Sequence, residues 1–334
     1  MALPSQTPCR CIVRGSINSD EYFYVTTISR PGETISSKGY QRRIGGKGAN
    51  QAVAIARAGG NVDFYGAIGH DGVWIKEEMK NLGMNIQGLI TSDDPTGRAL
   101  IQVADNGENS IVLHPGANHS QLHEELFESD KQILPVVTHL LLQNEIHMRS
   151  NLYALDHAHG AISIMNPSPL PAASEIIKFP WHKIDWLVVN EGEAEDLLKS
   201  INGQVTSTWS STEEMLRGLF ALPPFQKTNI VCTLGAQGVL AAVRVNSAAS
   251  IIFVPAAKLQ NPVLDTTGAG DCFTGYFVRG LMAFGPDSWV GRGMTVLDVE
   301  NILKTCVQAA GISVERSGTI DSIPFEDEVK ERMK

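Results

Sequence analysis

The segment Asp265–Met282 carries the strongest chemical signal in the sequence. A turn of small residues, Gly268, Ala269 and Gly270, leads directly into an apolar helical pattern. Small residues let backbone N–H groups approach a ligand closely, and a helix N-terminus adds roughly half a positive charge. The turn therefore predicts an anion hole, suited to charge that develops on a phosphate during transfer. Asp271, at the start of the helix, could accept a proton from a substrate hydroxyl, or it could simply cap the helix.

A second glycine-rich segment, Arg42–Gly59, surrounds Lys47 with glycines and then continues as a helical pattern. Its spacing matches neither a P-loop nor a dinucleotide fingerprint. The backbone here can come close to a small polar ligand, and Asn50 offers both a donor and an acceptor. Taken alone, the segment also fits a simple glycine-rich turn.

Two polar segments follow predicted strands. In Gly15–Asp20, Asn18 and Asp20 stand at alternate positions and would share a face, which suits recognition of sugar hydroxyls. In Asn190–Leu197, Asn190 and Glu193 are three apart and could face one site across the first turn of a helix. Mg²⁺ usually takes few protein carboxylates together with substrate phosphates. The alternatives are an ordinary strand-end turn and an acid-rich helix start, which the helix dipole favours.

Short apolar runs that alternate with helix-length segments must position these residues. The runs are almost continuously apolar, as strands buried on both faces are, and they indicate a parallel sheet with helices on both sides. Ligands of such sheets bind beyond the carboxyl ends of the strands. The predicted strands are Cys11–Ile17, Val62–Gly69, Thr138–Glu145, Ile162–Pro167, Asp185–Glu191 and Asn229–Gly235, and Gly48–Gly59 is a predicted helix.

Two stretches depart from this pattern. Ser19–Gly45 is rich in β-formers around a Pro-Gly turn, and Thr96–Asn118 alternates around Asp105–Gly107, a strong hairpin signal. Both are expected to be antiparallel. Together they predict a small sheet beside the main one, serving as a lid over the site or as a dimer surface.

Composition excludes several classes of protein. The 334 residues are 43% hydrophobic and 19% charged, which excludes intrinsic disorder. The net charge of −9, without a basic run, argues against a nucleic-acid partner. No apolar stretch reaches the roughly 18 residues of a membrane span, and the first residues lack the apolar core of a signal peptide. The odd count of five cysteines predicts reduced thiols in a cytoplasmic protein, with the nucleus left open as a second location.

The segments GSINSD, GGKGAN, LHPGAN, QNE, NEGEAE, TLGAQG and DTTGAGD occur in this order along the chain. Through them the sequence resembles the ribokinase branch of the ribokinase-like carbohydrate kinases over nearly its whole length. The resemblance implies one α/β kinase domain over residues 10–330, with a mostly parallel central sheet flanked by helices. It also implies a small β-sheet lid, formed by about 18–45 and 96–116, that often makes a homodimer.

By the same resemblance, the chain would phosphorylate the 5-hydroxyl of D-ribose with ATP, using Asp271 as base and Gly268–Gly270 as anion hole. The expected sugar contacts are Asn18, Asp20, Gly46, Lys47, Asn50, Glu145 and Asp271. The expected nucleotide contacts are Asn190, Thr233, Gly235, Gly238 and Gly270. Glu193 would be linked to Mg²⁺. A monovalent cation, usually K⁺, would lie near Asp265, Thr267, Ser313, Arg316, Gly318 and Ser322, mostly through backbone carbonyls in the last four.

Some segments depart from the family pattern. Val307 takes a position where the family often has a polar adenine contact. The stretch 205–226 is longer and less regular than expected, and 282–300 resembles an insertion before the last helix. Two alternatives stay open. One is a kinase for a related substrate such as deoxyribose, fructose or adenosine. The other is a catalytically dead regulator that binds a sugar or nucleotide, against which the retained Asp271 and glycine turn both count.

Overall fold

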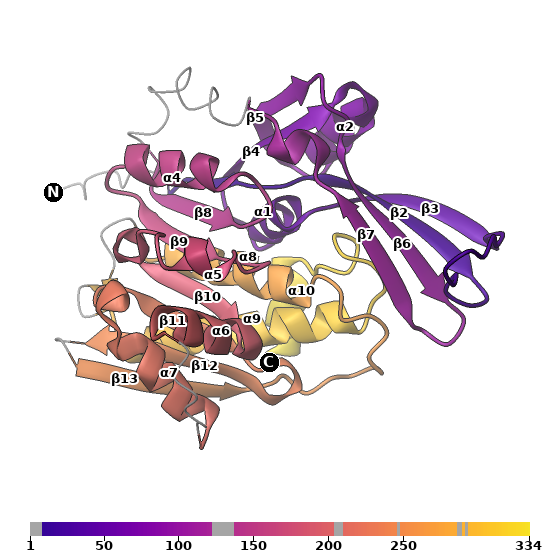
Figure 1. The fold of residues 1–334 in the computed structure, drawn as a ribbon. Coiled ribbons are helices and arrows are strands. Elements are labelled where there is room, and N and C mark those ends of the chain that lie inside the picture. The colour runs from indigo at the N-terminus through magenta and orange to yellow at the C-terminus, as the bar shows by residue number, and fades with distance from the viewer. Residues whose placement is uncertain (1–8, 122–136, 204–209, 246–247, 286–288, 291–292) are drawn as a thin grey trace, which may run out of the picture.

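The computed structural model describes residues 9–121, 137–203, 210–245, 248–285, 289–290 and 293–334. Its main element is a nine-stranded sheet in the order β13-β12-β11-β10-β9-β8-β1-β4-β5 (Figure 1). Neighbouring strands from β11 to β5 pair in parallel, and only β12 and β13 add antiparallel pairs at one edge. The strands are β1 (Cys11–Arg14), β4 (Val62–Gly69), β5 (Asn85–Ser92), β8 (His139–Gln143), β9 (Ile162–Asn166), β10 (Trp186–Asn190), β11 (Asn229–Thr233), β12 (Gly238–Val245) and β13 (Ala248–Pro255).

Alternate residues of these strands feed two hydrophobic cores, one on each face of the sheet, because side chains of a strand point to opposite faces. Val13 packs into the first core and Ile12 into the second. The sheet is therefore covered on both faces, as its apolar strands require. The first core holds α1 (Lys47–Arg57), α2 (Val73–Asn81), α8 (Ala269–Met282), α9 (Val296–Val314) and α10 (Glu326–Arg332), and the second holds α4 (Met148–His157), α5 (Ala173–Ile176), α6 (Glu191–Ile201) and α7 (Thr212–Ala221).

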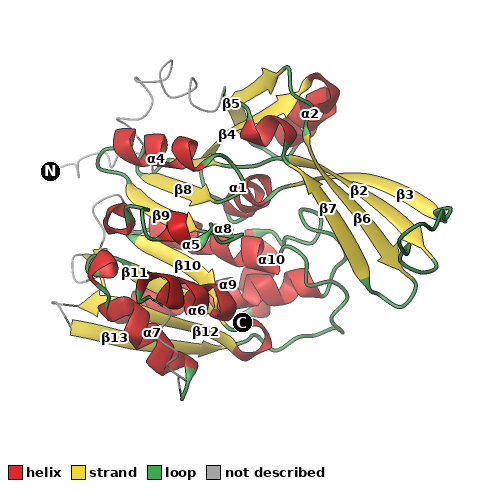
Figure 2. Ribbon diagram, viewed as in Figure 1, coloured by secondary structure: helices red, strands yellow, loops and turns green. Residues whose placement is uncertain are grey.

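A second sheet of four strands projects away from the helix-covered layer (Figure 2). Its order is β3-β2-β6-β7, in which β2–β3 and β6–β7 are antiparallel and β2–β6 is parallel. The predicted small sheet and the turn at Asp105–Gly107 are thus confirmed. These strands are β2 (Asn18–Val25), β3 (Gly39–Gly45), β6 (Gly97–Ala104) and β7 (Asn109–His114), and they are called the small sheet below.

The first predicted strand is too long. β1 ends at Arg14, and the chain then turns before β2 begins at Asn18. The turn is needed because Gly15 packs closely against α1 and β8: a Cβ on Gly15 would lie 2.9 Å from Gly48 Cα and 2.0 Å from Gln143 Oε1. Asn18 and Asp20 therefore begin a strand of the small sheet instead of ending a central one.

Other predicted elements agree with the structure to within a few residues, whereas β5, β12 and β13 were not predicted. The irregular stretch 205–226 lies partly outside the described residues, and its described part contains α7. The stretch 282–300 is likewise only partly described and includes the start of α9. Among the described residues, no helix combines the length and apolar character needed to cross a membrane.

Candidate active site

The carboxyl ends of the parallel strands bring polar residues from distant segments together. In the register of β8 with β9, Gln143 lies opposite Asn166, and in that of β10 with β11, Asn190 lies opposite Thr233. All four residues end their strands at the same edge of the sheet. This is the edge at which ligands of open α/β sheets bind.

Helix α8 begins at this edge with the glycine turn. Gly268 occupies the N-cap with φ +77°, a conformation that favours glycine, and it offers no side chain to cap the helix. The N–H groups of the first helical turn have no intrahelical acceptor. A Cβ on Gly270 would meet nothing within 4 Å, so open space lies in front of the turn. Backbone donors thus face an accessible volume, as an anion hole requires.

Asp271 lies in the first turn of α8 and is 6% exposed. Its two carboxylate oxygens accept hydrogen bonds from α1: Asn50 Nδ2 donates to Oδ2 and Gln51 Nε2 to Oδ1, each at 2.9 Å. Neither oxygen caps α8, which has no side-chain cap. Asp271 therefore does not act as the helix cap that was one of its two interpretations.

The glycine-rich segment before α1 packs against the other acids of the site. Gly46 has φ +90°, and the N–H of Lys47 donates to Glu145 Oε2 at 2.9 Å. Ser16 Oγ donates to the same oxygen at 2.5 Å. A Cβ on Gly45 would lie only 1.9 Å from Asp20 Oδ2. The glycines are therefore required because the backbone lies directly against carboxylates.

Asp20, near the start of strand β2 in the small sheet, is 7% exposed. Burial, with Glu145 and Asp271 nearby, raises the pKa of Asp20 to about 7. Its Oδ1 and Asn50 Oδ1 are buried and have no hydrogen-bond partner. Buried acceptors without a donor are costly, so these two atoms indicate a ligand that brings hydroxyl or N–H donors. Asn18 lies close by, and its Oδ1 accepts a bond from Asn118 Nδ2 at 2.7 Å.

Lys47 supplies the main positive charge among these acids. The negative charges of Asp271, Glu145 and Glu193 raise its pKa against the effect of burial, and Asp271 contributes most. The ammonium therefore stays protonated at neutral pH. It lines a cavity of about 130 Å³, called the polar cavity below, whose other walls include Asn166, Asn190, Glu193, Thr233, Gly268, Gly270 and Asp271.

A larger cavity of about 400 Å³, the apolar cavity, adjoins the polar one and shares Thr233 and Gly270 with it. Gly235 and Gly238, two of the predicted nucleotide contacts, line it. Val307 lies in its wall as well. Most of the remaining lining is apolar: Ala236, Ala256, Ala257, Leu259, Val263, Ala269, Phe273, Ala310, Gly311 and Val314. A flat apolar ring would fit between such walls, with a polar chain reaching the glycine turn.

Asn190 and Glu193 form a reciprocal cap at the start of α6. Asn190 Oδ1 accepts from the N–H of Glu193 at 2.8 Å, and Glu193 Oε2 accepts from the N–H of Asn190 at 2.9 Å. The pair therefore forms the acid-rich helix start that was the alternative to a magnesium site. Both residues also line the polar cavity. Because Glu193 uses one of its oxygens in the cap, its other oxygen is the one available to a hydrated Mg²⁺.

Asp265 joins the two loops that were predicted to hold a monovalent cation. Its Oδ1 accepts from the N–H of Thr267 at 2.9 Å and its Oδ2 from the N–H of Gly318 at 3.0 Å. Burial alone would raise the pKa of Asp265, but these hydrogen bonds hold it below its usual range. Ser313 and Ser322 turn their hydroxyls to backbone carbonyls of their own segment. The oxygen ligands left for a cation are those of one carboxylate and of backbone carbonyls, a set that suits K⁺.

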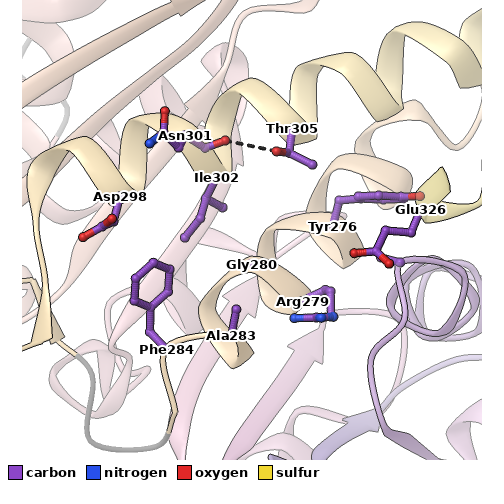
Figure 3. A pocket seen from close by; sticks show the side chains of 11 residues that line it. Tyr276, Arg279, Gly280, Ala283, Phe284, Asp298, Asn301, Ile302, Thr305 and Glu326 are labelled. Atoms are coloured by element: carbon purple, nitrogen blue, oxygen red, sulfur yellow. Dashed lines mark hydrogen bonds between the residues drawn. The ribbon is translucent and has the colours of Figure 1, made fainter. Parts of the chain in front are cut away.

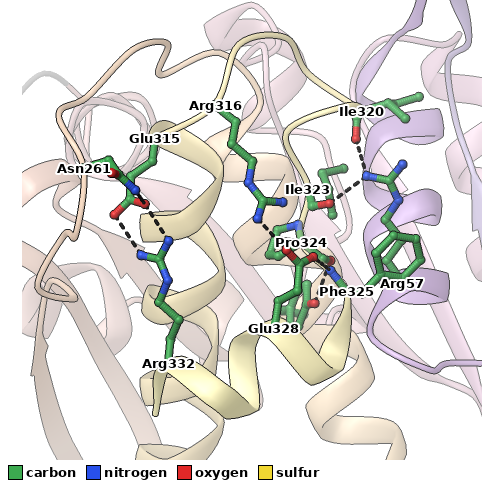
Figure 4. A network of polar contacts seen from close by, with 11 residues as sticks. Arg57, Asn261, Glu315, Arg316, Ile320, Ile323, Pro324, Phe325, Glu328 and Arg332 are labelled. Carbon is green, nitrogen blue, oxygen red and sulfur yellow. Dashed lines mark hydrogen bonds and ion pairs between the residues drawn. The ribbon is translucent and has the colours of Figure 1, made fainter. Parts of the chain in front are cut away.

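Three arginine side chains form hydrogen bonds and ion pairs around the second of these loops, which contains Gly318 (Figure 4). Arg57 of α1 donates to the carbonyls of Ile320 and Ile323. Arg316 pairs with Glu328 of α10, and Arg332 pairs with Glu315. Within the described residues, no cluster of three or more His, Cys, Asp or Glu could hold a metal.

Another cavity, of about 340 Å³, lies between α8, α9 and α10 (Figure 3). Arg279, Asp298 and Glu326 are among its lining residues. None of the predicted site residues lines it, so it is separate from the site at the strand ends.

Three residues of the site were not predicted. Gln51 is fully buried and bonds to Asp271, and Gln143 and Asn166 bond to Gln51. Gln51 directly follows Asn50 in the glycine-rich segment, and the other two end apolar strands. The polar residue at the end of each strand was therefore the available signal.

The geometry can now be compared with known proteins. A family model described as pfkB family carbohydrate kinase matches residues 10–326. The chain belongs to this family. Among pfkB carbohydrate kinases, a ribokinase of Haemophilus influenzae is 33% identical over 326 residues, which cover 96% of each chain.

Solved structures of the family agree with the fold. A ribokinase of Cryptococcus neoformans in complex with ADP is 44% identical, with a TM-score of 0.81, covering 97% of this chain and 99% of its own. An Arabidopsis thaliana ribokinase complexed with ribose and ATP is 26% identical, with a TM-score of 0.77, covering 98% and 99%. This pfkB kinase therefore has the ribokinase-like fold that its motifs predict.

The buried acid on the small sheet gives a first test. Because the folded pKa of Asp20 lies well above that of an unfolded aspartate, its ionisation costs stability as pH rises through about 7. Asp20→Asn is therefore expected to stabilise the ligand-free protein more at pH 8 than at pH 5. The gain in unfolding free energy should be larger at pH 8 by about 1 kcal/mol or more, with a correspondingly larger rise in melting temperature. Thermal unfolding at both values measures this. Asp196→Asn, at an exposed position, is the control, and an equal gain at both pH values would contradict the assignment.

Proposed function

We propose that the protein transfers the γ-phosphoryl group of ATP to the 5-hydroxyl of D-ribose, giving ribose 5-phosphate and ADP. The observation that carries the proposal is the position of Asp271. Its carboxylate lies at the glycine turn of α8 and is bonded to Asn50, whose free Oδ1 is an acceptor for a sugar hydroxyl. The names of the Haemophilus and Arabidopsis relatives support ribose as the sugar.

The geometry supports a simple mechanism. Asp271 takes the proton of the 5-hydroxyl as its oxygen attacks the γ-phosphorus, and the bond to the β-phosphate oxygen breaks to release ADP. The N–H groups of the turn at Gly268, Ala269 and Gly270, with the Lys47 ammonium, stabilise the charge on the transferred group. Such transfer needs little covalent chemistry from the protein and depends on positioning.

The sugar is proposed to lie between the small sheet and the strand ends. The proposed contacts are Asn18, Asp20, Gly46, Lys47, Asn50, Glu145 and Asp271. Glu145 also holds the Lys47 backbone, so it fixes the loop as well as offering an acceptor. The unpaired Oδ1 atoms of Asp20 and Asn50 favour a ligand with several hydroxyl donors.

ATP is proposed to place its base in the apolar cavity and its phosphates at Asn190, Thr233, Gly235, Gly238 and Gly270. Glu193 would bind the hydrated Mg²⁺ that neutralises the phosphates. Asp265 and Thr267, with carbonyls of Ser313, Arg316, Gly318 and Ser322, would hold K⁺ beside the turn. Among the described residues that line the apolar cavity, only Thr233 and Thr266 carry a polar side chain.

We further propose one kinase domain over residues 10–330, with the small sheet as lid (about 18–45 and 96–116) and as the contact of a homodimer. Ile111 and Leu113 are 50% and 60% exposed. Through the pairs Ile101–Ile111 and Ala99–Leu113 they lie on the sheet face that also carries Asp20. All five cysteines are free, four of them buried, which supports a reducing, cytoplasmic location.

Removal of the base tests the mechanism. Asp271→Ala is expected to retain ribose binding and to lose roughly 10²–10⁴-fold in kcat, because general-base catalysis typically contributes that much. Ribose-dependent release of ADP measures turnover, and calorimetry measures binding. Near-normal turnover would contradict the role of Asp271, while ribose binding with no ADP release by the wild-type protein would favour the regulator.

Substrate choice tests the hydroxyl contacts. A site built to bond a hydroxyl rejects an analogue that lacks it by roughly 10⁴-fold. We expect kcat/KM for 2-deoxyribose to fall below that for ribose by at least about a hundredfold, measured by the same ADP assay. Equal values would instead point to a kinase for a related sugar.

The dimer proposal has its own test. Leu113→Asp would place a charge in the proposed contact, and the protein is expected to become monomeric in sedimentation velocity experiments. Ile177→Asp, at an apolar position of α5's end that is 64% exposed, is the matched control and should leave the dimer intact. A monomeric wild-type protein would contradict the proposal directly.

A further inference from the structure

A chain of buried amide side chains connects the strand ends to Asp271. Gln143 Nε2 donates to Gln51 Oε1 at 2.7 Å. Gln51 Nε2 donates both to Asp271 Oδ1 and to Asn166 Oδ1, each at 2.9 Å. Asn166 Nδ2 in turn donates to the carbonyl of Val188 at 2.9 Å. The chain thus runs through β8, α1, α8, β9 and β10.

Burial makes this chain rigid. Gln51 and Gln143 are fully buried, and Asn166 is 9% exposed. The amide of Gln51 uses its oxygen and both of its N–H groups, so a flipped amide would face Gln143 with a donor and Asp271 with an oxygen. The contact with the Asp271 carboxylate would then be repulsive, in a place that water does not reach. A single orientation of Gln51 is therefore maintained.

The approach of two helices brings Gln51 to Asp271. Helix α8 has Gly275 one turn after Asp271, and a Cβ there would lie 2.4 Å from Ala54 Cβ and 2.7 Å from the Gln51 carbonyl oxygen. Only glycine lets α8 pack this closely on α1. The close packing fixes the distance between the two backbones, and the Gln51 amide bridges what remains.

We infer that Gln51 is a positioning residue for the phosphoryl transfer: its amide holds Asp271 Oδ1 so that Oδ2 faces the substrate hydroxyl. The inference rests on the proposed function, since it takes Asp271 as the base. Asn50, a proposed sugar contact that is 5% exposed, bonds to Oδ2, whereas the fully buried Gln51 bonds to Oδ1. A substrate can displace the first bond and leaves the second in place.

Removal of the amide should therefore reduce the rate and spare binding. Gln51→Met keeps the length of the side chain and removes both donors. We expect kcat to fall roughly 10–10²-fold, because small errors in the position of a reacting group cost that much. KM for ribose should stay within about threefold. Gln143→Met, which frees Gln51 Oε1 without touching Asp271, should give a smaller fall of the same kind.

Gln51→Glu tests the contact with the base through the pH profile, while the split between kcat and KM in Gln51→Met distinguishes positioning from a purely structural role. A second carboxylate beside Asp271 disfavours full ionisation of the pair. The acid limb of the kcat–pH profile is expected to move to higher pH, with activity partly regained in alkaline buffer. Asp20, Lys47, Glu145 and Glu193 also face this region, as does Cys272, whose thiol pKa burial raises to about 12. They are identical in both proteins, so the difference reports the substitution.

The control is Asn229→Leu, at a residue that is 4% exposed and lies at the opposite end of β11. It loses the partly buried hydrogen bond that the Arg244 N–H donates to Asn229 Oδ1 and should reduce stability without changing kcat. Parallel losses of kcat, ribose affinity and melting temperature in Gln51→Met, with an unchanged Gln51→Glu profile, would overturn the inference. So would a Gln51→Met kcat within twofold of wild type. If Gln51→Met does not fold, the isosteric Gln51→Glu decides.

The wild-type protein separates this outcome from failure of the proposed function. If it releases no ADP with ribose, the ribose assignment fails. The variants are then compared with the sugar or nucleoside that the wild type does phosphorylate, because the amide chain acts on the base and not on the identity of the hydroxyl compound. Unchanged kcat in both Gln51 variants with that substrate would overturn the inference alone.

Discussion

The site depends on keeping several carboxylates close together at the edge of a buried sheet. Like charges in a poorly hydrated place repel strongly, and each must be stabilised separately. Asp271 receives two side-chain amides, and Glu145 receives a hydroxyl and a backbone N–H. Asp20 has no such donor on Oδ1, and its pKa rises to about 7. The three acids are thus chemically different because their neighbours differ.

The fold supplies these neighbours through register and close packing. Strand ends in matching register place Gln143 beside Asn166 and Asn190 beside Thr233, although these residues are far apart in sequence. Glycines then bring backbone against side chain where a Cβ would collide, at Gly45 with Asp20 and at Gly275 with α1. The glycine-rich segments therefore serve packing around acids as well as backbone contacts to a ligand.

Much of this could be predicted from sequence. Continuous apolar runs predicted the parallel strands, and the Asp-Asn-Gly turn predicted the β6–β7 hairpin, because both signals are local. The end of β1 at Arg14 was missed, since it follows from the contact of Gly15 with Gly48 and Gln143 across the fold. Gln51 was missed for the same reason: a buried glutamine in an apolar helix shows its partners only in three dimensions. Val307, which takes the motif position of a polar adenine contact, lines the apolar cavity in the structure, but its role toward a nucleotide stays a prediction.

The break after β1 has a mechanical meaning. Asp20 belongs to the sheet that projects from the molecule, whereas Asp271 belongs to a helix of the main layer. A ligand that bonds to both acids would link the small sheet to the main layer. It would thus add to the covalent link that the segment Gly15–Ile17 makes between β1 and β2.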